Sequence, residues 1–265
     1  MEKYLVKKCQ CNEDIIKITD IKTLINYCRN LIFPGYFTKE DQETTLNNIK
    51  ELLCCEITKV ASLTNIKLDN KEIIESFTLE LPKIIELVKS DLVFFYESDP
   101  AAESYDEIII TYPGFFASLV HRFSYTLASL NVPLIPRMMS EYVHSKTGID
   151  IHPKANIDHS FFIDHGTGIV IGETSVIGHH VKIYQGVTLG ALSLNKGQAL
   201  KNIKRHPTIK NYVTIYACAS ILGGETIIGN NVTIGANSFI LESIEDNTIV
   251  KLSSVDLEYI KKKES

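Results

Sequence analysis

The sequence predicts an α+β fold in which an all-helical N-terminal domain precedes a parallel β-helix. Two observations support this. Up to about residue 147, apolar residues recur at intervals of three and four, which is the spacing of amphipathic helices. After Gly148 an isoleucine or leucine recurs every six residues, a period typical of neither a single helix nor a single strand. We therefore expect a helical domain over 1–147, a β-helix over 148–246 and a C-terminal tail over 247–265.

Length and composition are compatible with this division. The 265 residues are 45% hydrophobic, which is enough for one large or two modest domains with cores. The net charge of −5 argues against a nucleic-acid-binding protein, because no broad basic surface is implied. We expect a cytoplasmic protein without a membrane span, since no secretory signal and no run of about 18 apolar residues is present. The six cysteines form no CxxC pair, so we expect reduced thiols and no metal site.

Four segments of the first half carry the helical pattern. In "ELPKIIELVKSDLVFFYESD" we expect Pro82 to open a helix, and Gly148 is expected to end the helix "PRMMSEYVHSKTG". We predict six to eight helices in this half. The segment "TLNNIKELLCCEITKVASL" has an apolar face made of Leu46, Ile49, Leu53, Ile57 and Val60. The segment "YPGFFASLVHRFSYTLASL" has one made of Phe116, Leu119, Val120, Phe123 and Leu127.

The six-residue repeat predicts a triangular coil. If the chain turns a corner every six residues, three short strands make one coil, and each coil rises by about 4.8 Å. One aliphatic side chain per strand then points inward and stacks on its counterpart in the next coil. These positions are Ile151, Ile157, Ile163, Ile171, Ile177, Ile183, Leu189, Ile209, Ile215, Ile221, Ile228, Ile234 and Ile240.

Three steps break the period. Ile163 to Ile171 is eight residues, which places two additional residues just after Asp164 and His165. Leu189 to Ile209 is twenty residues, which we interpret as eighteen plus two, a looped-out coil. The seven-residue step that ends at Ile228 predicts a one-residue bulge.

Several strings in order resemble one family. They are "ESDPAA", "YPGFFASLVHR", "GIDIHPKANID", "IDHGTGIVIGE", "VTLG" and "RHPTI", between about residues 90 and 245. Together with the repeat they resemble the serine O-acetyltransferases, hexapeptide-repeat acyltransferases with a left-handed β-helix. The long excursion resembles the long-loop branch of that family. The resemblance implies transfer of acetyl from acetyl-CoA to L-serine, which gives O-acetyl-L-serine and CoA in the first step of cysteine biosynthesis.

The chemistry requires a base, because a serine hydroxyl is a poor nucleophile at neutral pH. Histidine, with an ordinary pKa of about 6.5, suits this role and contributes roughly 10²–10⁴-fold. His165 matches the base of the family, and Asp150 matches the carboxylate that orients that base. The two residues are fifteen apart, so adjacent coils could bring them together.

The substrate is a zwitterion, so its pocket needs both anionic and cationic groups. By family matching, Asp99 and Asp164 bind the amino group, while Arg205 and His206 address the carboxylate and the reacting centre. For acetyl-CoA, which we expect as a substrate without any metal cofactor, small residues must line a groove. The matching positions are Gly190, Ala191, Ala217 and Ala236.

The resemblance further implies a homotrimer or a dimer of trimers, with the active site between neighbouring subunits. Segment 190–208 is a candidate lid, and cysteine feedback inhibition is implied. The C-terminal serine differs from the isoleucine of members that bind O-acetylserine sulfhydrylase, so we do not expect a stable cysteine synthase complex. We expect His121 and Arg122 to pack in a helix, and the adjacent His179 and His180 to lie at the surface on opposite faces of a strand.

Three alternatives remain open at this point. The acceptor could be another hydroxyl or amine, as in related hexapeptide acetyltransferases. A γ-type carbonic anhydrase shares the prism, but its three metal-binding histidines find no plausible spacing here. A non-catalytic β-helix scaffold would bind no CoA.

Overall fold

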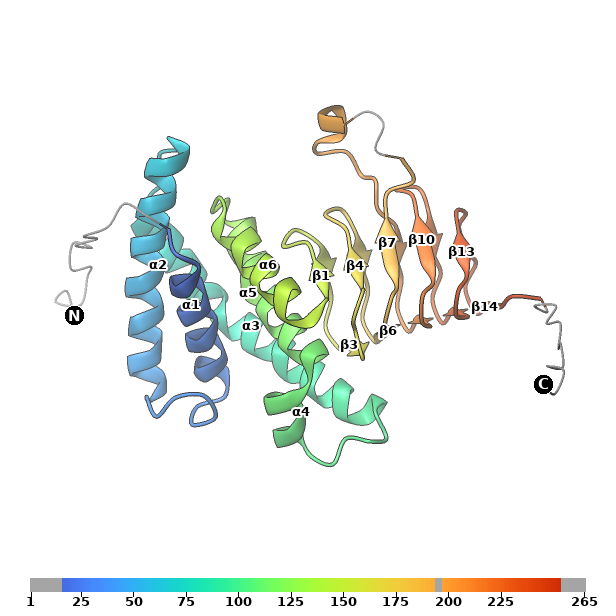
Figure 1. The fold of residues 1–265 in the computed structure, drawn as a ribbon, viewed down its shortest axis with the longest axis horizontal. Helices are drawn as coiled ribbons and strands as arrows, with labels where there is room; N and C mark the ends of the chain where they lie inside the picture. The colour runs from blue at the N-terminus through green and yellow to red at the C-terminus, as the bar shows by residue number, and fades with distance from the viewer. Residues whose placement is uncertain (1–15, 194–196, 254–265) are drawn as a thin grey trace, which may run out of the picture.

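The computed structural model describes residues 16–193 and 197–253, and within them a helical domain is followed by a parallel β-helix (Figure 1). The first half contains six helices in the described residues, within the predicted six to eight. None of the helices there is long and apolar enough to cross a bilayer. The helices are α1 (Ile18–Ile32), α2 (Gln42–Thr64), α3 (Asn70–Ser98), α4 (Tyr105–Thr111), α5 (Pro113–Ser129) and α6 (Ile135–Thr147).

Local sequence explains where these helices begin and end. The carboxylate of Asp41 caps α2 by accepting the backbone N–H of Thr44 at 2.7 Å. Gly148 ends α6 in the left-handed conformation, with φ of 71°, as predicted. The predicted apolar face of α2 is confirmed, because Ile49, Leu53, Ile57 and Val60 are fully buried.

The prediction that Pro82 opens a helix is wrong. Helix α3 begins twelve residues earlier, at Asn70, where Asp69 accepts two backbone N–H groups, and it continues through Pro82 to Ser98. An interior proline removes one backbone hydrogen bond. The long buried stripe on both sides of it, which includes Phe77, Leu81 and Ile84, supplies the packing that outweighs this loss.

The second half coils into three parallel sheets. Sheet 1 has the order β1-β4-β7-β10-β13, sheet 2 the order β2-β5-β8-β11, and sheet 3 the order β3-β6-β9-β12-β14. The chain visits sheets 1, 2 and 3 in turn, so each coil is a triangle. The strands are β1 (Asp150–Ile151), β2 (Asn156–Ile157), β3 (Phe161–Asp164), β4 (Val170–Ile171), β5 (Val176–Ile177), β6 (Val181–Tyr184), β7 (Thr188–Gly190), β8 (Thr208–Ile209), β9 (Thr214–Ile215), β10 (Ser220–Leu222), β11 (Ile227–Ile228), β12 (Thr233–Ile234), β13 (Phe239–Ile240) and β14 (Ile249–Val250).

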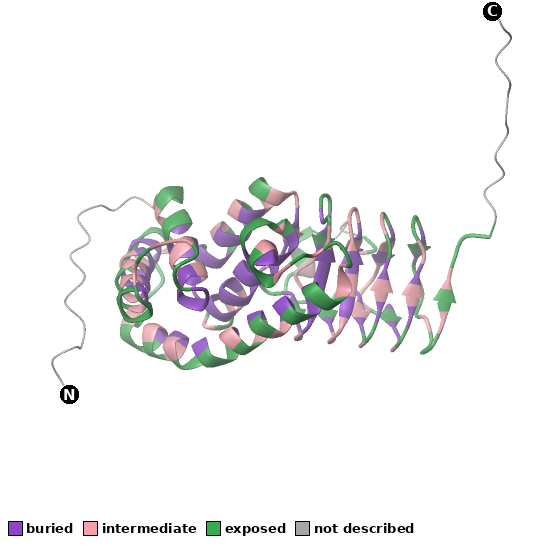
Figure 2. Ribbon diagram, turned by 90° about the horizontal axis from the view of Figure 1, so that it is seen from below, coloured by how far each residue is buried: buried purple, intermediate pink, exposed green. Residues whose placement is uncertain are grey.

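The predicted stacking of aliphatic side chains is confirmed. All thirteen repeat positions are buried, and Figure 2 shows the buried interior along the coils. In sheet 1 the register aligns Ile151, Ile171, Leu189, Ile221 and Ile240. The other two sheets align their repeat positions in the same way. Strand β14 pairs with β12. It lies within 247–265, the segment that was predicted to be a C-terminal tail.

The long excursion is not a looped-out coil. Leu189 lies in sheet 1 and Ile209 in sheet 2, the next sheet in order, so the additional residues enlarge a single corner. A looped-out coil would have returned the chain to the same sheet. The excursion carries the 3₁₀ helix η1 (Gly197–Leu200) and projects from one side of the coils (Figure 1).

Two histidines at another corner depart from expectation. His179 and His180 were expected to point to opposite faces of a strand, but their Nδ1 atoms lie 3.0 Å apart. The reason is that they occupy a corner, where His180 has φ of 56°, and strand alternation does not hold there. Both side chains are half-buried rather than fully at the surface.

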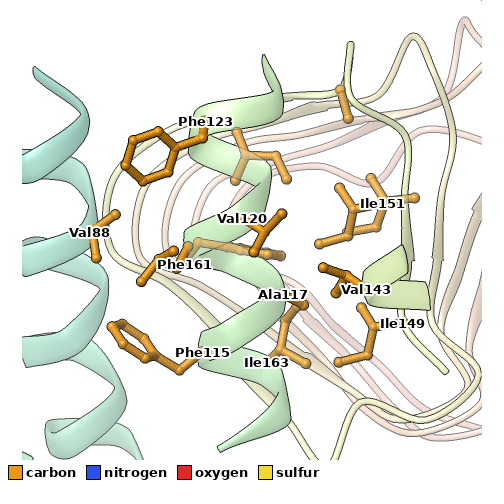
Figure 3. Close-up of a cluster of buried hydrophobic side chains, with 14 of the residues drawn as sticks. Val88, Phe115, Ala117, Val120, Phe123, Val143, Ile149, Ile151, Phe161 and Ile163 are labelled. Carbon is orange, nitrogen blue, oxygen red and sulfur yellow. The ribbon is translucent and has the colours of Figure 1, made fainter. Parts of the chain in front are cut away.

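Helix α5 joins the two halves. Its residues Ala117, Val120 and Phe123 pack between α3 and the first coil (Figure 3). As predicted, His121 and Arg122 are buried in this helix. The guanidinium of Arg122 donates to both carboxylate oxygens of Asp91 on α3, at 3.0 and 2.9 Å, and to backbone carbonyls of the first coil. The helical domain is therefore joined to the β-helix by hydrogen bonds from this buried ion pair, since Arg122 donates to the Asp158 carbonyl at 2.7 Å and Asp91 accepts the Phe161 N–H at 2.9 Å, as well as by apolar contacts.

The C-terminal residues 254–265 lie outside the described residues. The prediction that the C-terminus forms no stable cysteine synthase complex falls on them.

Candidate active site on two edges of the β-helix

The predicted site residues of the β-helix lie along two of its three edges. We call the corner between sheets 3 and 1 the His165 edge, and the corner between sheets 1 and 2 the Arg205 edge. The two edges border sheet 1 on opposite sides. Asp150, Asp164, His165, Ala217 and Ala236 lie at or beside the His165 edge, whereas Gly190, Ala191, Arg205 and His206 lie on the Arg205 edge.

His165 is presented to solvent by the irregular corner that the sequence indicated. Strand β3 ends at Asp164, and His165 then adopts φ of 56°, followed by Gly166 at 86°. The imidazole is 70% exposed, and its Nε2 lies 3.6 Å from Oδ1 of Asp164. The ring is therefore accessible to an acceptor molecule and has a carboxylate beside it.

Asp150 lies at the start of sheet 1, beside the same edge. No hydrogen bond joins it to His165 in the described part of the chain. Its carboxylate instead lies near Glu141 and His144 of α6, with the ligand atoms of all three within 4.8 Å of one another. These are donor types that could hold a metal ion, but Glu141 already has an ion pair with Arg137, and we assign no ion.

Asp99 comes from the helical domain, where it is the C-terminal cap of α3. Its Oδ1 accepts the backbone N–H of Ala101 at 2.8 Å, and its Oδ2 accepts the hydroxyl of Tyr112 at 2.7 Å. Sequence reasoning missed Tyr112, although it stands in the family-like string "YPGFFASLVHR". The carboxylate is thereby held in one orientation.

Asp99 and Asp164, which are 65 positions apart, both act on the same two tyrosines. Burial raises the pKa of Tyr112 above its ordinary value, and the hydrogen bond to Asp99 and the negative charges of Asp99 and Asp164 raise it further. Burial also raises the pKa of Tyr184, again with help from the charges of Asp164 and Asp99. Tyr184 is the register partner of Asp164 on the adjacent coil. The two carboxylates predicted to bind one ammonium group therefore both lie near Tyr112 and Tyr184.

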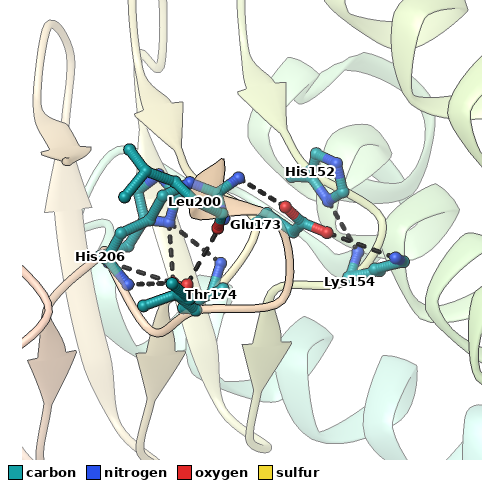
Figure 4. Close-up of polar contacts among 8 residues, drawn as sticks. His152, Lys154, Glu173, Thr174, Leu200 and His206 are labelled. Carbon is teal, nitrogen blue, oxygen red and sulfur yellow. Dashed lines mark hydrogen bonds and ion pairs between the residues drawn. The ribbon is translucent and has the colours of Figure 1, made fainter. Parts of the chain in front are cut away.

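On the Arg205 edge, the residues that end the excursion form hydrogen bonds with Thr174 (Figure 4). The hydroxyl oxygen of Thr174 accepts the backbone N–H groups of Arg205 and His206 at 2.9 and 3.0 Å, and His206 Nδ1 accepts the Thr174 N–H at 3.1 Å. Burial, and then the charge of Arg205, lowers the pKa of His206 to about 4. Gly172 is required here, because a Cβ would lie 2.0 Å from Cδ2 of His206.

Arg205 already has an anionic partner in this chain. Its Nη2 pairs with Oε2 of Glu173, whose Oε1 also lies 3.3 Å from Nζ of Lys154. Sequence reasoning missed Glu173, although it is the last residue of the string "IDHGTGIVIGE". A bound carboxylate would share the guanidinium with Glu173.

The four residues expected to line a CoA groove are also divided. Gly190 ends β7 and Ala191 begins the excursion, on the Arg205 edge. Ala217 and Ala236 occupy successive corners of the His165 edge, where Ala236 is exposed. Gly190 leaves little room for a side chain, since a Cβ would lie 2.8 Å from Cδ2 of Leu222.

One chain alone does not bring the two edges together. A side of six residues at about 3.3 Å per residue separates them by roughly 20 Å. In Figure 1 the excursion rises on one side of the coils, whereas β3 and β6 lie toward the other. Within one chain, an acceptor bound at His165 therefore does not reach Arg205.

Known serine acetyltransferases are similar to this chain in sequence and in fold. No family model matches the sequence. A plasmid-encoded serine acetyltransferase of Synechococcus elongatus is 44% identical over 69% of this chain and 61% of its own length. The serine acetyltransferase of Bacillus pumilus is 40% identical over 62% of this chain and 73% of its own length. The matched region spans between half and about three fifths of the first five curated relatives.

Solved structures show the same architecture. Serine acetyltransferase 1 of Entamoeba histolytica, crystallised with L-cysteine, superposes with a TM-score of 0.79 at 38% identity, over 87% of this chain and 86% of that one. A serine acetyltransferase in complex with CoA gives a TM-score of 0.61 at 29% identity, over 89% of this chain and 98% of that one.

Proposed function

Because this chain belongs to the serine acetyltransferase family, we propose that it transfers the acetyl group of acetyl-CoA to the hydroxyl of L-serine. The products are O-acetyl-L-serine and CoA. The observation that carries the proposal is the exposed imidazole of His165 beside the Asp164 carboxylate, with Asp99 and Asp164 both acting on Tyr112 and Tyr184. Two carboxylates next to a base are suited to an acceptor that carries both an ammonium group and a hydroxyl.

In this mechanism His165 is the general base. Its imidazole takes the hydroxyl proton of serine while the oxygen attacks the thioester carbonyl. The tetrahedral intermediate then expels the thiolate of CoA, which recovers a proton from the imidazolium. Asp150 and Asp164 stabilise the positive charge that His165 carries between the two steps.

The carboxylate end of serine is bound from the other edge. Arg205, oriented by Glu173, offers donors in the planar geometry that a carboxylate accepts. His206 is buried and its pKa is lowered to about 4, so it is neutral at working pH. Its Nδ1 accepts the Thr174 N–H, which leaves Nε2–H as a donor toward the reacting centre.

The site is completed by a neighbouring copy in a homotrimer or a dimer of trimers. The division of the site residues between two edges supports this, because a threefold arrangement can place the His165 edge of one subunit against the Arg205 edge of the next. Acetyl-CoA lies in the groove between them, against Gly190 and Ala191 of one subunit and Ala217 and Ala236 of the other. We place the enzyme in the cytoplasm.

One assay tests the proposed function. The purified full-length chain is mixed with acetyl-CoA and L-serine, and release of the CoA thiol is followed with a chromogenic disulfide. We expect turnover with L-serine and not with sugars or other hydroxyl acceptors. A protein that turns over a sugar instead, hydrates carbon dioxide to bicarbonate, or releases no thiol with any acceptor contradicts the proposal.

A further inference from the structure

We propose that Tyr112 is a positioning residue for the ammonium site, acting through Asp99. The inference rests on the proposed function and adds a residue to it. The hydroxyl of Tyr112 donates to Asp99 Oδ2 at 2.7 Å, and this contact links the α4–α5 junction to the end of α3.

The backbone around Tyr112 is fixed on both sides. Tyr112 caps the C-terminus of α4, where its N–H donates to Ile108 at 3.2 Å, and it also precedes α5, where its carbonyl accepts Phe116 N–H at 3.0 Å. Its ring meets that of Phe95 edge to face, with centroids 6.4 Å apart. Phe95 is one helical turn before Asp99 on α3. The phenol is therefore held against the same turn that carries the carboxylate.

The hydrogen-bonding capacity of Asp99 leaves room for a substrate. An ionised carboxylate offers about four acceptor positions. The backbone N–H of Ala101 uses one on Oδ1, and Tyr112 uses one on Oδ2. The remaining positions can accept an ammonium group, and the two existing donors prevent the carboxylate from rotating away from it.

Tyr112 is also suited to remain a donor. Because it is partly buried and beside two carboxylates, ionisation of the phenol is disfavoured. It therefore donates to Asp99 throughout the physiological pH range. An ammonium ion bound at Asp99 would find that carboxylate oriented before it arrives, which lowers the cost of binding.

The test is the variant Tyr112→Phe in the full-length protein. We expect the KM for L-serine to rise about three- to tenfold, which is the effect of losing one hydrogen bond of ordinary strength. The KM for acetyl-CoA and kcat should change less than about twofold. Tyr36→Phe is the matched control, since Tyr36 also donates to a carboxylate, that of Asp106, on the outer side of α4. This control should leave both KM values unchanged.

A double-mutant cycle with Asp99→Asn tests whether Tyr112 acts through Asp99. We expect Tyr112→Phe to have little further effect on L-serine KM in the Asp99→Asn background. If turnover of that background is too slow, calorimetric titration with L-serine gives the same comparison. An unchanged KM for L-serine in Tyr112→Phe, or additive effects of the two substitutions, would overturn the inference. The proposed function would still stand in that case, provided that the wild-type protein turns over L-serine. A wild-type protein that releases no thiol with L-serine overturns both.

Discussion

The Nε2 atom of His165 lies 3.6 Å from Oδ1 of Asp164, the residue directly before it. Consecutive side chains on a strand point to opposite faces, but His165 has φ of 56° and has already left β3. The two additional residues of this corner thus allow an acid and an imidazole to meet at an exposed edge. In the helical domain the carboxylate of Asp99 is held by Tyr112, whose pKa is raised by the charges of both Asp99 and Asp164.

The ion pair between Asp91 and Arg122 should be required for stability. Both side chains are buried, with exposed fractions of 0% and 2%. Arg122→Met leaves the Asp91 carboxylate buried with fewer donors, so we expect a loss of about 3–5 kcal/mol in unfolding free energy. Urea denaturation followed by circular dichroism measures it. The exposed pair of Lys71 and Glu75 is the control, and Lys71→Met should have no measurable effect. Equal stability of the two variants would contradict the assigned role.

Stability should decrease with acid between pH 6.5 and about 4. Burial lowers the pKa of His121 to about 3 and those of His152 and His206 to about 4. An unfolded histidine titrates near 6.5, so in this range the unfolded chain binds more protons than the folded one. Each such group makes unfolding easier by up to about 1.4 kcal/mol per pH unit as pH falls. Denaturation at several pH values measures the slope, and His152→Gln should reduce it. If His152→Gln leaves the slope of unfolding free energy against pH unaltered, His152 is not buried in its neutral form.

Mixed oligomers should regain activity if two chains share each site. His165→Ala removes a residue of one edge and Arg205→Ala a residue of the other. The two inactive variants are unfolded together and refolded at equal ratio, so that subunits assemble at random. About a quarter of the interfaces then contain both the wild-type His165 and the wild-type Arg205. We expect about a quarter of wild-type turnover. Refolded single variants are the controls. If the mixture stays as inactive as they are, the two edges do not cooperate between subunits.

The sequence predicted the β-helix well because its period is a direct consequence of geometry. Every sixth residue must face the interior, so Ile151 and its twelve counterparts could be assigned without tertiary information. The helix boundaries of the first half were harder to predict from the sequence. Pro82 was expected at a helix start, but packing along α3 outweighed its local preference.

Part of the candidate site could be predicted because it interrupts the six-residue repeat. His165 and Asp164 stand beside an irregularity of the repeat, which made them visible. Tyr112 and Glu173 were missed because their roles depend on contacts with Asp99 and Arg205, residues at sequence separations of 13 and 32. No local spacing rule encodes such contacts. The division of the site between two edges likewise became apparent only when the register of the coils was known.

Replacement of His165 tests the central claim most directly. The imidazole is 70% exposed, so His165→Ala should fold and assemble as the wild type does, which thermal unfolding and sedimentation can establish. We expect kcat for acetyl transfer to L-serine to fall by roughly 10²–10⁴-fold, with both KM values little changed. A correctly assembled His165→Ala protein that transfers acetyl at the wild-type rate would contradict the account.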